Sequence, residues 1–524
     1  MSDLNANETP KAASKKGYRT VVLLLLTVVY GFNFIDRQIV GILAPFIQAD
    51  LGLTNTQLGL LIGLAFAAFY TIMGIPLAFL ADRVNRVNLL AISLAVWSGF
   101  TALTGLSQNF LHIALARIGV GIGEAGGSPP SHSMISDFYG KEERSGALGV
   151  YSLGIPLGIM SAYFLTAALL GADATDVNWR RIFIILGITG LFLSLIVRLV
   201  IIEPQRGAVE ITTHDTSPTV RFNDSFKSLA ILLGFVVAFA LLAQLLGASD
   251  TFLGTTLNWD VVTIFIILFG VCLAVMTRLS LRIPEVPKHI VKKEEALKVP
   301  FLIGVRTLLS IPSWWWMCLG IAFASFASYA ISGFQTKYLL LLDPEFNFRT
   351  IVIWIGIING TFYVAGTYFG ARLVDWKAKT DIRAYGTIPA ISILLCLPLA
   401  IATFAVPTVI AHLAIGAFLQ LCLGVYLGPS FAIAQTLAPI RIRAMSTALF
   451  FFILNMIALG GGPTFAGAMI DVFGRAGNVE LVATRYAMFT TFAAYGLSVM
   501  AYLIVRKTLP KDWAAAEARN SDAN

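Results

Sequence analysis

The chain has 524 residues, of which 57% are hydrophobic and only 13% carry a formal charge. Soluble domains carry roughly 25% charged residues, so this composition excludes an ordinary water-facing protein and favours one that is surrounded by lipid. The net charge of +8 does not indicate nucleic-acid binding, because Lys and Arg lie mainly in short loops between apolar runs, as the positive-inside rule describes.

Apolar runs of about 20 residues, the length that crosses a membrane, recur along the whole chain. Six begin near Thr20, Thr56, Asn88, Phe110, Gly146 and Arg181. Two more cover residues 227–246 and 261–277, and six further runs begin near Pro312, Thr350, Arg383, Pro407, Arg443 and Arg485. We therefore predict an all-α polytopic membrane protein with fourteen spans, in the order six, two and six.

The polar segments between these runs set the expected organisation. It comprises a cytoplasmic tail (1–19), a six-helix bundle (20–203), a cytoplasmic linker (204–226), two additional helices (227–277), a basic linker (278–311), a second six-helix bundle (312–506) and a tail (507–524). The Lys and Arg residues of the tails and of alternate loops predict that both termini are cytoplasmic. In a bacterium the membrane would be the plasma membrane.

Some motifs have plain structural explanations. The four cysteines lie inside apolar runs without metal-ligand spacing, so we expect no disulfide, no metal and no cofactor. Residues 121–126 match the dinucleotide pattern GxGxxG but lie within a predicted span rather than after a strand. Gly119, Gly123 and Gly127 recur at every fourth residue, which predicts close packing against a neighbouring helix.

Charged residues inside spans are costly and face a cavity or a partner. Asp36 lies roughly 24 Å along its helix, and Arg117 roughly 10 Å along a helix that runs in the opposite direction. Both therefore fall at a similar depth in the external half of the membrane, and we predict that Asp36 and Arg117 form a pair. Glu124 follows Arg117 by nearly two turns, near mid-membrane.

Glu124 and Asp36 are the candidate proton-coupling residues. A carboxyl group removed from water binds a proton more readily than a solvated one, which suits proton exchange during transport. The alternative for Glu124 is a permanently paired structural carboxylate.

A substrate cavity is expected between the two bundles. Aromatic residues would give its first half an apolar surface that suits an amphipathic molecule, and Arg37 and Lys337 would hold an anionic head group or extend to the membrane interface. The candidate cavity residues are Arg37, Arg117, Phe66, Phe69, Tyr70, Tyr151, Gln335, Lys337, Asn359, Tyr363, Gln420 and Asn455.

The halves echo each other at one cytoplasmic turn. Asp82, Arg83 and Arg86 stand between the second and third spans, and Asp375 is followed by Lys377 at the corresponding turn of the second half. Such an echo is typical of internally repeated transporters. We expect Asp82, Arg83, Arg86 and Asp375 to form a cytoplasmic gate, although the arginines alone would also serve as a topology signal.

These motifs resemble the major facilitator superfamily. The resemblance rests on the segment Ala78–Arg86, on Arg117 to Gly123, on Gly154 to Gly158 and on Glu203 to Arg206. Within the superfamily, Phe34 to Arg37 and Arg117 to Ala125 resemble the Spinster group of lysolipid and sphingolipid transporters. The resemblance implies alternating access, with Asp36, Arg37, Arg117 and Glu124 lining the cavity and Asp82 and Arg86 at the gate. The two additional helices depart from the usual twelve.

Three functions remain open at this point. The first is a proton-linked transporter, expected to be a monomer, that moves an amphipathic lysolipid-like or drug-like molecule through a lipid membrane. The second is a symporter for small organic anions, and the third is a receptor or scaffold without transport. The charges inside the membrane disfavour the third, and nothing indicates an enzyme.

Overall fold

The computed structural model describes residues 16–81, 84–170, 177–204, 251–252, 255–256, 301–439 and 442–521. The additional helices predicted at 227–246 and 261–277 lie outside these residues. Within them, eleven helical segments are long and apolar enough to cross a membrane.

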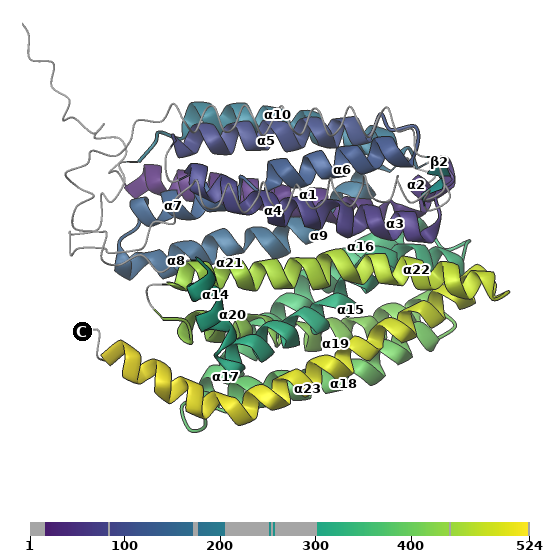
Figure 1. Cartoon of the computed structure of the whole chain (residues 1–524). Helices are drawn as coiled ribbons and strands as arrows, with labels where there is room; N and C mark the ends of the chain where they lie inside the picture. Colours follow the sequence, from purple (N-terminus) through teal and green to yellow (C-terminus); the bar gives the residue numbers. More distant parts are fainter. Residues whose placement is uncertain are drawn as a thin grey trace, which may run out of the picture.

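The first half of the chain forms one bundle, shown in purple to blue in Figure 1. Its helices are α1 (Lys16–Ile42), α2 (Ala44–Leu51), α3 (Asn55–Ile62), α4 (Leu64–Ala81), α5 (Arg86–Thr104), α6 (Phe110–Glu124), α7 (Ser128–Phe138), α8 (Lys141–Ser152), α9 (Gly154–Leu169) and α10 (Trp179–Val200). Inside this bundle α5 packs on α10 and α6, and α1 packs on α9.

The second bundle, in green to yellow, begins after a two-stranded antiparallel pair, β1 (Thr251–Phe252) and β2 (Thr255–Thr256). Its helices are α14 (Phe301–Leu309), α15 (Pro312–Leu342), α16 (Phe348–Ile358), η2 (Asn359–Tyr363), α17 (Val364–Ala378), α18 (Ala384–Ala405), α19 (Val409–Gly424), α20 (Leu427–Thr436), α21 (Arg443–Leu454), η4 (Asn455–Gly460), α22 (Gly461–Arg475) and α23 (Glu480–Ser521). The segments η2 and η4 are π-helical turns that join α16 to α17 and α21 to α22.

Helix starts follow the chemistry of the capping residue. The side chains of Asn85, Asn109 and Asn347 accept hydrogen bonds from the first turns of α5, α6 and α16. Phe110 and Pro312 begin α6 and α15 as the hydropathy pattern predicts, whereas the last helix begins at Glu480 rather than near Arg485.

The predicted fourth span is divided in two. It consists of α6 and α7, separated by a turn over residues 125–127. Gly126 and Gly127 stand at this turn, and two prolines open α7, residue types that disfavour a continuous helix. This division explains why the predicted fourth span is not among the eleven long apolar segments of the described residues.

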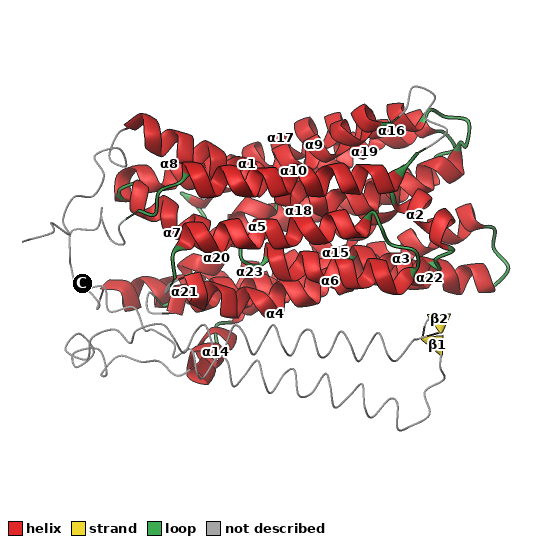
Figure 2. Ribbon diagram, turned by 90° about the horizontal axis from the view of Figure 1, so that it is seen from above, coloured by secondary structure: helices red, strands yellow, loops and turns green. Residues whose placement is uncertain are grey.

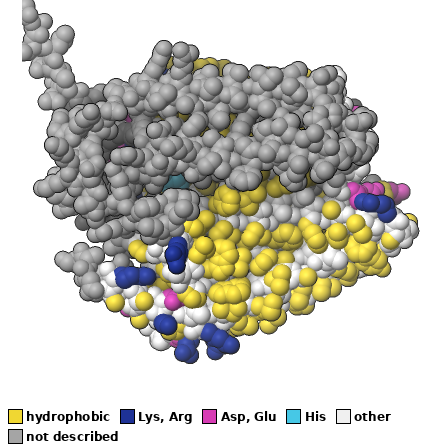
Figure 3. Space-filling model, viewed as in Figure 1, with side chains coloured by type: hydrophobic (Ala, Val, Ile, Leu, Met, Phe, Trp, Pro, Cys, Tyr) yellow, Lys and Arg dark blue, Asp and Glu magenta, His cyan; other side chains and the backbone are white. Residues whose placement is uncertain are grey.

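An apolar surface surrounds the bundles. Leu199, Ile410 and Phe192 are 80%, 69% and 68% exposed, which is unfavourable in water and expected in lipid. Figure 3 shows an apolar band across the second bundle, with charged side chains gathered at its two ends. The protein is therefore a multi-pass integral membrane protein.

The helices run between two ends of the molecule, the near end and the far end (Figure 2). The near end carries the start of α1 and the end of α23, at the left of Figure 1, and the far end carries α2 and the turn between α22 and α23, at the right. The bundles meet where α3 packs on α22, α4 packs on η4, α9 packs on α16 and η2, and α1 packs on α15. Figure 2 shows the same helices running between the two ends from above.

Candidate functional site

Four charged residues meet inside the first bundle, two from α1 and two from α6. Arg37 Nε lies 2.7 Å from Glu124 Oε2, and the Glu124 side chain is fully buried. Arg117 Nη1 lies 3.8 Å from Asp36 Oδ1, and both side chains are at most 2% exposed. The predicted pairing of Asp36 with Arg117 is therefore confirmed. The pairing of Arg37 with Glu124 was not foreseen.

Glycines let α6 come close enough to its neighbours to place these residues. A Cβ atom on Gly123 would lie 2.7 Å from the backbone nitrogen of Trp97 on α5, and one on Gly121 would lie 2.8 Å from the carbonyl oxygen of Phe66 on α4. A Cβ atom on Gly119 would overlap the Phe100 ring, whereas one on Gly127 would lie 3.5 Å from the Trp97 ring. The close packing predicted for Gly119, Gly123 and Gly127 is therefore confirmed at Gly119 and Gly123, and Gly127 leaves room for an ordinary contact.

Aromatic rings surround the Arg37 guanidinium. Its Cζ atom lies 4.3 Å from the ring centroid of Tyr70 and 5.0 Å from those of Phe34 and Phe66. The ring centroid of Phe66 also lies 5.1 Å from the Cζ atom of Arg117. Cation–π contacts of this kind stabilise a desolvated cation by about 0.5–2 kcal/mol. Phe34 contributes to this site without having been predicted.

The four charges sum to zero, yet their hydrogen bonding is incomplete. Thr101 on α5 donates to Asp36 Oδ2. Among the described residues, Glu124 Oε1, Asp36 Oδ1 and Arg117 Nε have no hydrogen-bond partner although they are buried. Buried polar atoms are nearly always satisfied, so this cluster retains capacity for a proton, water or a polar ligand.

The other predicted cavity residues of the first half lie in two settings. Phe69 and Tyr70 are partly exposed on α4, the helix that packs on η4 of the second bundle. Tyr151 is instead buried inside the first bundle, where its ring stacks on Tyr30 with centroids 4.4 Å apart. Tyr151 therefore packs against α1 inside the first bundle.

In the second half, three of the predicted cavity residues lie in the two π-helical turns. Asn359 and Tyr363 are the first and last residues of η2, and Asn455 begins η4. Both turns pack against the first bundle, and π-helical turns occur frequently at functional sites. Gln420 is partly exposed on α19.

Gln335 and Lys337 have more specific surroundings. Gln335 Nε2 lies 3.3 Å from His412 Nε2 within the second bundle. Lys337 lies near the far end of α15, where its Nζ atom is 2.5 Å from Glu480 Oε1 and donates to Gln48 Oε1 at 2.7 Å and to Asn55. Its contacts therefore join the two bundles at the far end.

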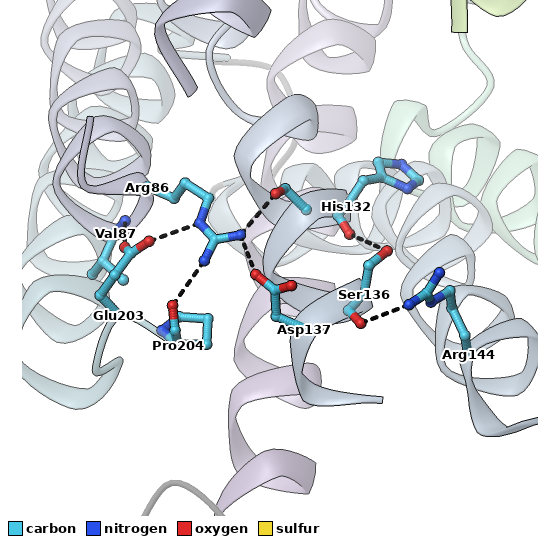
Figure 4. Close-up of polar contacts among 9 residues, drawn as sticks. Arg86, Val87, His132, Ser136, Asp137, Arg144, Glu203 and Pro204 are labelled. Atoms are coloured by element: carbon cyan, nitrogen blue, oxygen red, sulfur yellow. Dashed lines mark hydrogen bonds and ion pairs between the residues drawn. The ribbon is translucent and has the colours of Figure 1, made fainter. Parts of the chain in front are cut away.

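At the near end, the buried side chain of Arg86 is the centre of a polar network within the first bundle (Figure 4). Arg86 Nε lies 2.7 Å from Glu203 Oε1, and its Nη1 lies 2.5 Å from Asp137 Oδ2 and donates to Ser133 at 2.7 Å. Arg86 Nη2 donates a further hydrogen bond of 2.9 Å to the carbonyl oxygen of Pro204.

The bonds of Arg86 bear on the predicted cytoplasmic gate, which would have to join the two bundles. The partners of Arg86 lie on α7 and just beyond α10, so these bonds hold the first bundle together rather than joining it to the second. Asp375 likewise accepts a hydrogen bond of 3.0 Å from Tyr385 within the second bundle. Asp82 and Arg83 lie outside the described residues.

Comparison with known proteins agrees with this architecture. A model of the Major Facilitator Superfamily matches residues 26–248. An MFS-type efflux pump of Mycolicibacterium smegmatis (strain ATCC 700084 / mc(2)155) is 27% identical over 452 residues, which cover 85% of this chain and 83% of that protein. A bacterial homolog to the human lysosomal transporter Spinster, solved in an inward-facing and unoccupied conformation, has the same fold, with a TM-score of 0.72 at 24% identity over 95% of this chain and 99% of that chain.

Other relatives match a shorter stretch. The protein spinster homolog 1 of Mus musculus is 28% identical over 207 residues, which cover 39% of this chain and 38% of that protein. A probable L-galactonate transporter of Escherichia coli (strain K12) is 31% identical over 180 residues, which cover 34% of this chain and 39% of that protein.

Proposed function

We propose that this chain, which is similar to transporters of the major facilitator superfamily and to a Spinster homolog, moves an amphipathic, lysolipid-like or drug-like substrate by proton-coupled alternating access between its two six-helix bundles. The observation that carries this proposal is the buried pair of Arg37 and Glu124 beside a group of aromatic rings. One chain contains both bundles, so a monomer without a cofactor suffices.

The pair links proton binding to anion binding. When Glu124 takes up a proton it loses its charge, and the charge-assisted hydrogen bond from Arg37 Nε weakens. A buried guanidinium without a counter-ion is unfavourable by several kcal/mol. An anionic group of the substrate can then replace the Glu124 carboxylate, so protonation and anion binding favour each other.

The second pair gives the cluster a fixed support. Asp36 and Arg117 lie beside the first pair, and Thr101 holds the Asp36 carboxylate. Asp36 is the second candidate proton site, because its Oδ1 atom has no hydrogen-bond partner among the described residues. Protonation of Glu124 acts directly on Arg37, whereas protonation of Asp36 would act on Arg117.

The rings favour a substrate with an apolar part. Phe66 and Tyr70 stack with centroids 5.5 Å apart next to Arg37, so a head group at the guanidinium would adjoin aromatic surface. Apolar contact with few polar groups is typical of sites for amphipathic ligands. The similarity to an efflux pump over most of the chain and to a Spinster homolog agrees with this substrate class.

A second function has its own support. The chain is 31% identical to a probable L-galactonate transporter over about a third of its length, and Arg37 could bind a small carboxylate as well as a lipid head group. We therefore retain a proton- or cation-coupled symporter of small organic anions as the alternative.

Flux measurements in proteoliposomes distinguish these functions. The panel pairs an anionic lysolipid with a hexonate sugar acid, under an imposed pH gradient, for the wild type and Glu124→Gln. Glu143→Gln is the matched control, because Glu143 is an exposed carboxylate outside the charge cluster. Its Oε2 atom lies 2.8 Å from Arg19 Nη1.

Gradient-driven lysolipid flux that loses its dependence on the gradient in Glu124→Gln, but not in Glu143→Gln, supports the proposal. Flux of the sugar acid alone supports the alternative. Coupling that is unchanged in Glu124→Gln would contradict the role of Glu124.

A further inference from the structure

The far end of the molecule holds a second polar cluster that joins the two bundles. Asp471 of α22 contacts the start of α3, and Lys337 of α15 contacts α2 and α3 while pairing with Glu480 of α23. The first bundle contributes only uncharged groups to this cluster, and the second contributes all three charges.

Asp471 caps a helix of the opposite bundle. Its Oδ1 atom accepts from the backbone N–H of Asn55 at 3.2 Å and from the Asn55 side chain at 2.9 Å. Its Oδ2 atom accepts from the Thr56 backbone N–H at 2.7 Å and from the Thr56 hydroxyl at 2.5 Å. These N–H groups are among the donors that a helix start leaves unpaired. Separation of the bundles would therefore leave both α3 and Asp471 without these partners.

Lys337 connects the same turn to α23. Only 5% of its side chain is exposed, while 49% of the Glu480 side chain is exposed. The ammonium group thus depends on Glu480, Gln48 and Asn55 for its stabilisation while the bundles are together. Since Glu480 reaches solvent, water can replace it when the bundles part.

Close backbone contact surrounds these polar groups. A Cβ atom on Gly59 would lie 2.3 Å from the carbonyl oxygen of Pro463, and one on Gly467 would lie 2.1 Å from that of Asn55. Thus α3 and α22 touch directly, with no room for a side chain at either glycine.

The cluster is also joined to the charge cluster through α1 and α15. Gln38, which follows Arg37, accepts a hydrogen bond of 2.9 Å from Ser332. Thr336, which precedes Lys337, donates to the carbonyl oxygen of Gly41 at 2.9 Å. Movement of α1 at Arg37 would therefore be transmitted to the residues that position Lys337.

We propose that Lys337, Asp471 and Glu480 form the far-side gate of the transporter and close on Gln48, Asn55 and Thr56. The inference rests on the alternating access of the proposed function but not on the identity of the substrate. The near-end networks of Arg86 and Asp375 stay within single bundles. The bonds of the far-side gate join the bundles, so they stabilise the conformation that is closed at the far end.

Distances between spin labels test the gate without any substrate. Labels are placed at Gln108→Cys and Glu345→Cys, two exposed far-end positions in different bundles, after the four native cysteines are replaced by alanine. Distances are measured by pulsed electron paramagnetic resonance in lipid nanodiscs. Lys337→Met and Asp471→Asn are compared with Arg349→Met, a change at an exposed far-end arginine outside the gate.

We expect Lys337→Met and Asp471→Asn each to raise the ratio of long to short distances by roughly tenfold, with Arg349→Met unchanged. If Lys337→Met or Asp471→Asn prevents folding, judged by loss of a monodisperse elution profile, Glu480→Gln at the half-exposed partner serves instead. Exchange of the charges in Lys337→Glu with Glu480→Lys should restore part of the short-distance population.

Identical distance distributions in the wild type and both gate variants would overturn the gate. Failure of lysolipid flux in the transport experiment would leave these distributions untouched, so the two proposals fail separately.

Discussion

Arg37 on α1 donates through Nε to Oε2 of Glu124 on α6 at 2.7 Å, and the acceptor side chain is closed to solvent. The other carboxylate oxygen of Glu124 has no hydrogen-bond partner among the described residues. A carboxylate held on one side only can bind a proton on the other. This geometry places the candidate proton site directly beside the group proposed to bind the substrate anion.

The guanidinium of Arg37 should be required, and not merely its charge. Lysine at this position keeps a cation but loses the planar face that contacts Tyr70 and Phe66, and it loses the Nε donor to Glu124. We expect Arg37→Lys to raise the KM for an anionic lysolipid by about tenfold or more, measured as flux into proteoliposomes. Arg181→Lys, at an exposed arginine of α10, should leave KM unchanged, and an equal effect of both changes would refute the specific role.

Asp36 and Arg117 should behave as a coupled pair. Neutralising one partner leaves an unpaired buried charge, so Asp36→Asn or Arg117→Gln alone should each lower the free energy of unfolding by about 3–5 kcal/mol. The double variant should lose at least about 1 kcal/mol less than the sum of the single losses. Thermal unfolding in detergent measures the cycle, and strictly additive losses would show that the 3.8 Å contact carries no coupling.

Arg86 should matter for stability of the first bundle. Its guanidinium bonds Glu203 through Nε, both Asp137 and Ser133 through Nη1, and the carbonyl oxygen of Pro204 through Nη2, a fork that lysine cannot reproduce. We expect Arg86→Lys to cost about 2–4 kcal/mol and to lower the Tm accordingly. Arg372→Lys, at an exposed arginine of α17, is the control, and a Tm equal to that of the wild type would argue against a structural network.

The sequence predicts the helices well because hydropathy and capping act locally. Asn109 caps α6 one residue before the predicted start, and Pro312 opens α15 where a span was expected. The interruption of the fourth span could also have been read from Gly126, Gly127 and the two prolines that follow. Fourteen spans were predicted, and the two additional ones lie outside the described residues.

Depth along a helix can be predicted from the sequence, whereas partners across helices depend on how each helix is rotated. Depth alone was enough to pair Asp36 with Arg117. It could not show that Arg37 turns to Glu124, nor that Lys337 faces Gln48 and Glu480.

Contacts between the halves were harder still to predict. The bond from Asn55 to Asp471 joins residues 416 positions apart. No local pattern in the chain marks Asp471 as the cap of a helix in the other bundle.

The central claim is that proton binding at Glu124 and anion binding at Arg37 favour each other. The most direct measurement is the Kd of lysophosphatidylglycerol, whose phosphodiester stays charged, for the protein in nanodiscs between about pH 5 and pH 8. The account predicts that the wild type and Glu143→Gln bind more tightly as the pH falls, while Glu124→Gln binds tightly at every pH. A Kd that does not change with pH in the wild type, or that changes equally in Glu124→Gln, would contradict it.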